Sequence, residues 1–200
     1  MSSDNAITMV TVDRARTALL LMDFQAEVVP MFERAPPAMA RAVELAAAAR
    51  AAGLAVIYVT VGFRPGYPEV SPRNATFAPI VQGNRMVLGT PGAEVASALR
   101  PAAGDVVVVK HRVSAFAGTD LEIVLRAKGI ETLILSGVAT SGVVLSTLRH
   151  AADADYRLIV VEDACADRDE EVHRVLTGKV FPRQATVTTT AEVVAALAGA

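Results

Sequence analysis

Short, almost continuous apolar runs recur along the chain and are rich in Val, Leu and Ile. Runs of this kind, without the strict alternation of a half-exposed strand, are typical of strands buried on both faces of a parallel sheet. We therefore predict six strands, at Thr17–Asp23, Ala55–Val61, Val106–Lys110, Thr132–Gly137, Arg157–Asp163 and Ala185–Thr188.

Segments with helical spacing of apolar residues lie between these runs. Thr119, followed three residues later by Glu122, resembles a capping box, and Ser141 is a candidate N-cap. Gly53 and Gly129 stand where a left-handed residue would end a helix. The predicted helices are Pro37–Ala52, Glu94–Leu99, Thr119–Lys128, Ser141–Ala154, Asp169–Val180 and Thr190–Leu197.

The alternation of strands and helices predicts a Rossmann-like, three-layer α/β/α sandwich with a six-stranded, mostly parallel sheet. Because the chain has 200 residues and is 52% hydrophobic, we expect one domain over residues 1–200, with residues 1–16 as an N-terminal extension. Ligands of such sheets bind beyond the carboxyl ends of the strands, at the switch point of the strand order. The functional site is expected there.

The segment Gly62–Pro91 interrupts this rhythm, since it holds five prolines and four glycines without a sustained period. It is predicted to be a long ordered loop that forms either a lid or binding wall, or an oligomer contact. Arg64, Tyr67, Arg73 and Arg85 lie in it. The arginines suit a carboxylate substrate, although surface ion pairs or a subunit contact explain them equally well.

Composition and charge limit the kinds of molecule that the protein is expected to bind. The net charge of −2 and the even scatter of charged residues give no basic stripe, so we expect no nucleic-acid partner. The first sixteen residues lack the apolar core of a signal peptide, and no apolar run approaches the ~20 residues of a membrane helix. A single cysteine, Cys165, excludes an intramolecular disulfide. We expect a cytoplasmic protein that acts on a small neutral or anionic metabolite.

Three predicted strand ends carry informative chemistry: Asp23, Lys110 and Gly137. The carboxyl ends of parallel strands share one edge of a sheet, so these residues could meet. Taken singly, an aspartate there can simply cap the next turn, and a lysine can reach solvent with its long side chain.

Four motifs resemble the isochorismatase-like (cysteine hydrolase) superfamily, and the resemblance runs from about Thr17 to Leu197. The motifs are Leu20–Gln25, Lys110 with Ser114–Phe116, Gly118–Leu121, and Gly137–Thr140. The resemblance implies that Asp23 and Lys110 are the catalytic aspartate and lysine of the superfamily. It places the family's nucleophilic cysteine at Val143, which has no nucleophilic atom.

No other residue is an obvious replacement for that cysteine. Cys165 lies among small residues, as a packed apolar thiol does. Ser141 is explained as an N-cap, Ser146 lies a turn beyond it, and neither has an adjacent histidine in the sequence.

Metal and cofactor are not expected. Nicotinamidase-like members bind a metal through histidines that the segment Val61–Pro65 lacks. His111, His150 and His173 are scattered, and His111 should point away from Lys110 because strand side chains alternate. Each histidine is predicted to be a surface or supporting residue.

The resemblance implies a hydrolase that works on a small metabolite without a cysteine nucleophile, with Asp23 as general acid or base. Lys110 would orient the substrate or stabilise negative charge. Vinyl-ether hydrolysis, amide hydrolysis by an Asp23-activated water, and a catalytically silent binding protein remain open. The substrate-binding residues implied are Phe24, Gln25, Arg64, Phe116, Val138, Ala139 and Thr140.

The resemblance also implies a cis peptide at Val138–Ala139 and a homo-oligomer, either a dimer or a tetramer. We expect the Asp23 and Lys110 strands to be neighbours, with the Thr132 strand beside the Lys110 strand. Strands that are not neighbours would contradict this site, because they would separate the two catalytic side chains.

Overall fold

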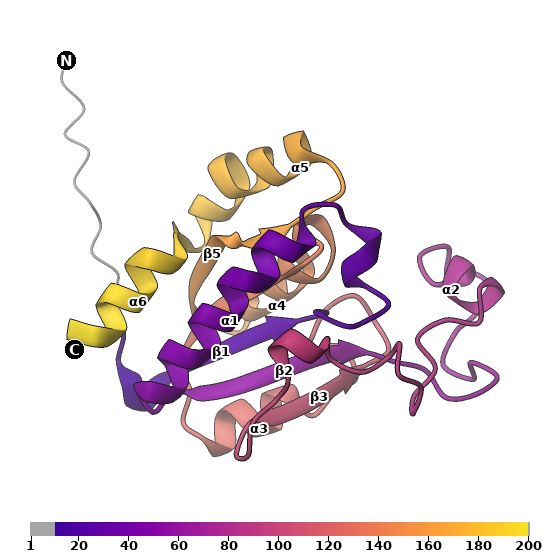
Figure 1. Ribbon diagram of the computed structural model, residues 1–200, viewed down its shortest axis with the longest axis horizontal. Helices are drawn as coiled ribbons and strands as arrows, with labels where there is room; N and C mark the ends of the chain where they lie inside the picture. Colours follow the sequence, from indigo (N-terminus) through magenta and orange to yellow (C-terminus); the bar gives the residue numbers. More distant parts are fainter. Residues whose placement is uncertain (1–10, 200) are drawn as a thin grey trace.

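The computed structural model describes residues 11–199, so most of the predicted N-terminal extension lies outside the described residues. Six parallel strands form one sheet, flanked by helices (Figure 1). The predicted α/β fold is therefore confirmed, and the sheet is parallel throughout. The strands are β1 (Thr17–Met22), β2 (Ala55–Val61), β3 (Val106–Lys110), β4 (Thr132–Val138), β5 (Arg157–Ala166) and β6 (Thr186–Thr188).

Burial follows strand position in the sheet. Every residue of the central strands β1 and β4 is buried, as their continuous apolar runs predict. β3 lies at one edge, and Val107 and Val109 there are 48% and 36% exposed. Burial on both faces thus explains why the sequence pattern of the central strands does not alternate.

The helices divide the core into two layers. Leu19 and Leu21 of β1 pack in a cluster with residues of α1 and α6, whereas Leu20 and Met22 pack in a second cluster with residues of α3 and α4. In Figure 1, α1 lies in front of the sheet and α4 behind it. The helices are α1 (Ala35–Ala51), α2 (Ala78–Gln82), α3 (Leu121–Ala127), α4 (Leu145–Asp153), α5 (Glu170–Val175) and α6 (Thr190–Gly199).

Some of the predicted helix ends are confirmed and others are wrong. Gly53 and Gly129 are left-handed, with φ of 77° and 65°, as expected of residues that end helices. The capping box is wrong: Thr119 Oγ1 accepts from the N–H of Leu121 at 3.2 Å, but Glu122 pairs with Arg126 one turn along α3.

Ser141 is not an N-cap. It lies inside a π-helical turn, Thr140–Val144, and its N–H donates to Asp167 Oδ2 at 2.6 Å. The turn directly follows the Val138–Ala139 peptide, which is cis as expected. The regular helix α4 therefore begins later than the sequence predicts, at Leu145.

The predicted helix Glu94–Leu99 is also wrong, since only Ser97–Leu99 forms a short 3₁₀ turn. Its first residues are extended because they pair with the chain that follows β1. The N–H of Ala26 donates to the carbonyl of Glu94 at 3.0 Å, and the N–H of Ala96 donates to that of Phe24 at 2.9 Å.

The expected strand neighbours are wrong. The sheet order is β3-β2-β1-β4-β5-β6, so β2 separates the Asp23 strand from the Lys110 strand, and β4 pairs with β1. The chain builds β2 and β3 outward on one side of β1 and then returns to build β4, β5 and β6 on the other. The strand order consequently reverses between β1 and β4.

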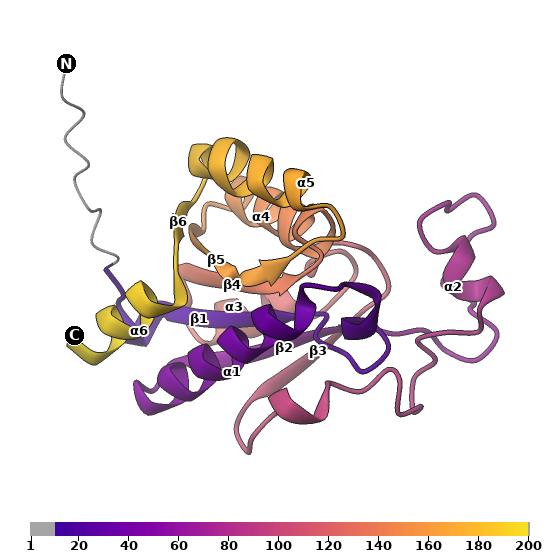
Figure 2. The ribbon, with the colours of Figure 1, turned by 45° about the horizontal axis from the view of Figure 1, so that its top comes forward.

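The long loop Gly62–Pro91 projects beyond the carboxyl end of the sheet and carries the short helix α2, as both ribbon views show (Figure 2). The sequence predicts the loop but not this helix. Among residues 11–199, no helix is both long enough and apolar enough to cross a bilayer.

Candidate active site

Two strand ends meet at the point where the strand order reverses, which is where parallel sheets bind ligands. Met22, at the end of β1, is in register with Gly137 of β4. A Cβ added to Gly137 would lie 2.7 Å from the carbonyl oxygen of Met22, so only glycine allows this close approach. Asp23 follows directly with φ of 60°, a left-handed conformation that few non-glycine residues adopt.

Asp23 and Lys110 form a buried ion pair at this edge. Lys110 Nζ lies 2.9 Å from Asp23 Oδ2, and the two side chains are 2% and 10% exposed. The ammonium also donates to the carbonyl of Arg112 at 3.1 Å. The strands of the pair are two spacings apart, about 10 Å. The lysine side chain is long enough to reach across β2, so the separation expected of non-neighbouring strands does not occur.

The electrostatics of Asp23 are dominated by its burial, which raises the pKa of the carboxyl above its ordinary value. The charge and hydrogen bond of Lys110 oppose this rise. Asp23 Oδ1 is buried, and within residues 11–199 no group donates a well-formed hydrogen bond to it, since the nearby N–H of Val61 donates to Gln25 Oε1 at 2.8 Å. A buried oxygen without a partner is costly, so this atom is available to a water or substrate that donates to it.

Phe24 and Gln25 belong to the scaffold of the site. Phe24 is 2% exposed and packs in the core beneath α1. Gln25 is fully buried: its Nε2 donates to the carbonyls of Val61 and Ala93 at 2.8 and 2.6 Å, and its Oε1 accepts from the N–H of Val61 at 2.8 Å. This amide connects the end of β2 to Ala93, two residues beyond the long loop.

The aromatic and basic residues expected to line the substrate pocket each have partners of their own. Phe116 stacks on His150, with ring centroids 4.7 Å apart and planes 8° from parallel. Arg64 is 65% exposed and pairs with Glu69 at 2.5 Å. Arg85 donates to the carbonyl of Glu27 at 3.0 Å, which holds the loop in place.

Val138 ends β4, directly after Gly137, the residue in register with Met22, and the turn Thr140–Val144 comes next along the chain. Val138 is 1% exposed and Thr140 is fully buried. Thr140 Oγ1 lies 2.8 Å from His173 Nδ1 on α5. Val143 is 2% exposed and packs in the core cluster that contains Leu148.

Cys165 is the only cysteine of the chain and lies in β5, where it is 5% exposed. Burial raises the pKa of its thiol to about 12. A thiol with such a pKa is almost wholly protonated at neutral pH and is a poor nucleophile. This agrees with the packed apolar role expected of it.

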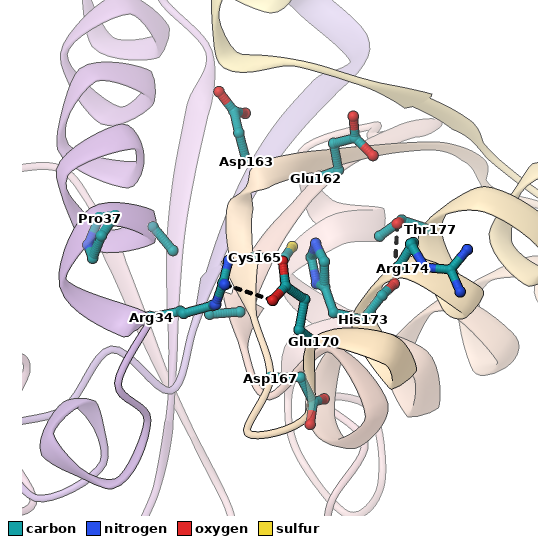
Figure 3. A pocket seen from close by; sticks show the side chains of 12 residues that line it. Arg34, Pro37, Glu162, Asp163, Cys165, Asp167, Glu170, His173, Arg174 and Thr177 are labelled. Atoms are coloured by element: carbon teal, nitrogen blue, oxygen red, sulfur yellow. Dashed lines mark hydrogen bonds and ion pairs between the residues drawn. The ribbon is translucent and has the colours of Figure 1, made fainter.

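A cavity that the sequence does not predict lies next to the turn after β4, because its lining residues His173 and Asp167 contact Thr140 and Ser141 of that turn (Figure 3). Its volume is about 450 Å³, and it is enclosed by the start of α1, the end of β5, and α5. His173, predicted as a supporting residue, lines it and also holds Thr140. The only signal in the sequence is the cluster of acids at the end of β5, at Glu162, Asp163 and Asp167.

No group of three His, Cys, Asp or Glu side chains within residues 11–199 is arranged to hold a metal ion. His111 is directed to the carbonyl of Gly62, at 2.5 Å from its Nδ1, whereas Lys110 is directed to Asp23. The two neighbouring side chains thus diverge as strand alternation predicts.

Comparison with known proteins identifies the family. The isochorismatase domain model matches residues 17–192. The chain is 33% identical over 192 residues to the isochorismatase family protein YecD of Escherichia coli O157:H7, covering 94% of this chain and all of the relative. It is 33% identical over 163 residues to a maleamate amidohydrolase of Pseudomonas putida, covering 79% of this chain and 76% of that enzyme.

Among solved structures, a cysteine hydrolase from Pseudomonas syringae pv. phaseolicola superposes with a TM-score of 0.88 at 27% identity, covering 94% of this chain and 95% of that one. The motifs around Asp23, Lys110 and Gly137 therefore stand in a chain that matches this family over nearly its whole length. This protein belongs to the isochorismatase family of hydrolases.

Proposed function

We propose that the protein hydrolyses an amide-type bond of a small metabolite, with Asp23 as general acid and base and without a cysteine nucleophile. The observation that carries this proposal is the buried Asp23–Lys110 pair, whose free oxygen, Oδ1, lies at the switch point of the sheet. The similarity to a maleamate amidohydrolase supports the amide class of substrate.

In this mechanism, Asp23 Oδ1 accepts a proton from a water molecule while the water oxygen attacks the carbonyl carbon of the amide. The carbonyl oxygen becomes negative and is stabilised by Lys110, whose ammonium has three protons and uses two of them on Asp23 and the Arg112 carbonyl. Asp23 then returns its proton to the nitrogen as the C–N bond breaks. The products are a carboxylic acid and an amine.

A thiol route has little support in this chain. The resemblance places the family nucleophile at Val143, a buried aliphatic side chain. The single thiol, Cys165, is protonated because it is buried. Water activated by Asp23 supplies the oxygen nucleophile without any covalent intermediate.

Vinyl-ether hydrolysis is a second candidate, because burial raises the pKa of Asp23 and thereby favours the protonated acid. Asp23 would then donate its proton to the enol carbon, and water would capture the oxocarbenium ion that results. The two mechanisms require opposite protonation states of the same carboxyl group.

The test is a screen of small primary amides, maleamate included, and of vinyl ethers, with the natural protein and Asp23→Asn. We expect turnover of an amide that falls by about 10²–10⁴-fold in Asp23→Asn, as is usual when a positioned acid or base is lost. Asp153→Asn, an exposed position at the end of α4, should retain full activity. Ligand binding without turnover in any variant would instead identify a catalytically silent binding protein.

Phe24, Phe116 and the residues Val138–Thr140 are proposed to shape the substrate pocket around the ion pair, with Gln25 and Arg64 supporting the long loop. We also propose a homodimer or homotetramer. Sedimentation at micromolar concentration tests this assembly, and a monomeric mass would contradict it.

A further inference from the structure

The cavity between the start of α1 and α5 (Figure 3) is not lined by Asp23 or Lys110, and it adjoins the turn after β4 through the contact of His173 with Thr140. We propose that this cavity binds a small organic cation that carries a primary ammonium group on a short apolar stem. Its volume of about 450 Å³ falls in the range of small-molecule sites. This second site goes beyond the proposed hydrolysis and does not depend on it.

The inner wall of the cavity is apolar. Ala38 of α1, with Cys165 and Ala166 of β5, lines it, and these residues are only 3%, 5% and 3% exposed. The Cys165 thiol adds no charge, because its burial keeps it protonated. Such a wall favours the hydrocarbon part of a ligand, since burial of apolar surface from both partners stabilises the complex.

Four acids line the cavity: Asp163 and Glu170 pair with Arg41 and Arg34, whereas Glu162 and Asp167 have no cationic partner within the described residues. Asp167 is 8% exposed, and its carboxylate accepts only from the N–H groups of Ser141 and Arg168, at 2.6 and 2.8 Å. Glu162 is half-buried. Over residues 11–199, neither carboxylate has a lysine, arginine or histidine nitrogen within 4.0 Å. Partly buried carboxylates of this kind favour a cation beside them.

The cations of the cavity stand at its mouth and already have partners. Arg34 is 62% exposed and pairs with Glu170 at 2.6 Å, an ion pair that joins α1 to α5 across the opening. Arg174 is 67% exposed and lies 3.9 Å from Glu171. An anionic ligand would have to displace these partners and approach Glu162 and Asp167, so the charge pattern favours a cation.

An ammonium group fits this pattern better than a metal ion. No three His, Cys, Asp or Glu side chains of the described chain converge as metal ligands. An ammonium group needs only hydrogen-bond acceptors, which the free carboxylate of Glu162 supplies. His173 Nδ1 lies 2.8 Å from Thr140 Oγ1, and its second ring nitrogen accepts a hydrogen bond from an ammonium group in the tautomer in which Nδ1 donates to Thr140.

The probes for the test are benzylamine, benzyl alcohol and benzoate, which share a ring and differ in the charge of the head group. Binding is followed by the amide NMR shifts of Thr140 and Ala166 in the natural protein, Glu162→Gln, Asp153→Asn and Asp23→Asn. Asp153→Asn is the control, because this exposed acid at the end of α4 neither lines the cavity nor pairs with a residue that does.

We expect saturable binding of benzylamine, at least about fivefold weaker binding of the other two probes, and a similar loss for benzylamine in Glu162→Gln. Asp153→Asn and Asp23→Asn should bind benzylamine as the natural protein does. No saturation up to roughly 10 mM, equal binding of benzoate, or full affinity in Glu162→Gln would overturn the proposal. Loss of binding in Asp23→Asn would also overturn it, since the amine would then occupy the candidate active site.

Discussion

Lys110 reaches Asp23 across the full width of an intervening strand, with 2.9 Å between Nζ and Oδ2. Both side chains are almost fully buried, so each charge depends on the other for its stability. The pair is therefore both a contact that stabilises the fold and the centre of the proposed mechanism. These two roles can be tested separately.

Removal of one partner should destabilise the fold more than removal of both. Lys110→Met leaves Asp23 buried without its cation, which costs about 3–5 kcal/mol in comparable pairs. Asp23→Asn/Lys110→Met should be more stable than the sum of the two single variants predicts. Urea denaturation of all four proteins measures the coupling energy. Strictly additive changes would show that the pair contributes no mutual stabilisation.

Lys110→Ala should be severely impaired in turnover, because it removes the ammonium group that is proposed to stabilise the negative oxygen.

The pH dependence of kcat/KM should distinguish the two candidate reactions. In amide hydrolysis Asp23 must be a carboxylate, so activity should fall as pH falls through its pKa, which burial places above the ordinary aspartate value. In vinyl-ether hydrolysis Asp23 must be protonated, so activity should fall as pH rises through the same pKa. A profile unchanged by Asp23→Asn would remove this group from either mechanism.

Thiol reagents should leave turnover intact. With a pKa of about 12, roughly one Cys165 thiol in ten thousand is ionised at pH 8, and burial limits access further. Iodoacetamide should therefore label the denatured protein much faster than the native one, as measured by mass spectrometry. Cys165→Ser should keep its activity. If Cys165→Ser were inactive while Asp23→Asn remained as active as the natural protein, the assignment of the active site to Asp23 and Lys110 would be wrong.

Val143→Cys tests the position that the family resemblance assigns to the nucleophile. If that geometry is retained, the new thiol should lie close enough to Lys110 for the charge to favour the thiolate, and it should be alkylated faster than Cys165. The comparison uses Cys165 in the same molecule as the internal reference. If the introduced thiol were as unreactive as Cys165, the turn after β4 would differ in geometry from the nucleophile turn of the family.

Gly137→Ala should disturb the junction of β1 and β4. The new Cβ would lie 2.7 Å from the backbone oxygen of Met22, an atom that cannot move without shifting the strand. We expect a loss of about 1–3 kcal/mol in unfolding free energy and reduced activity, since Asp23 follows Met22 directly. Gly178→Ala, where no atom lies within 4 Å of the added Cβ, is the control and should change stability by less than about 1 kcal/mol.

The sequence predicted the strands well because buried parallel strands must be continuously apolar. Helix beginnings were harder, since partners distant in sequence decide them. The sequence predicts Ser141 as an N-cap, but in the structure its N–H donates to Asp167. It predicts Glu94 in a helix, but the carbonyl of Glu94 accepts from Ala26 in an extended segment. The cavity was not predicted from the sequence, because its walls come from α1, β5 and α5, which are distant from one another in the chain.

By itself, the sequence determined the α/β architecture and singled out Asp23 and Lys110 at strand ends, because apolar patterning and residue chemistry are local properties. Only the tertiary structure decided the strand order and the burial that shifts the pKa of Asp23. It also decided that Lys110 crosses β2 to reach its partner. Strand order, burial and reach depend on how distant segments pack, and no local pattern of residues encodes them.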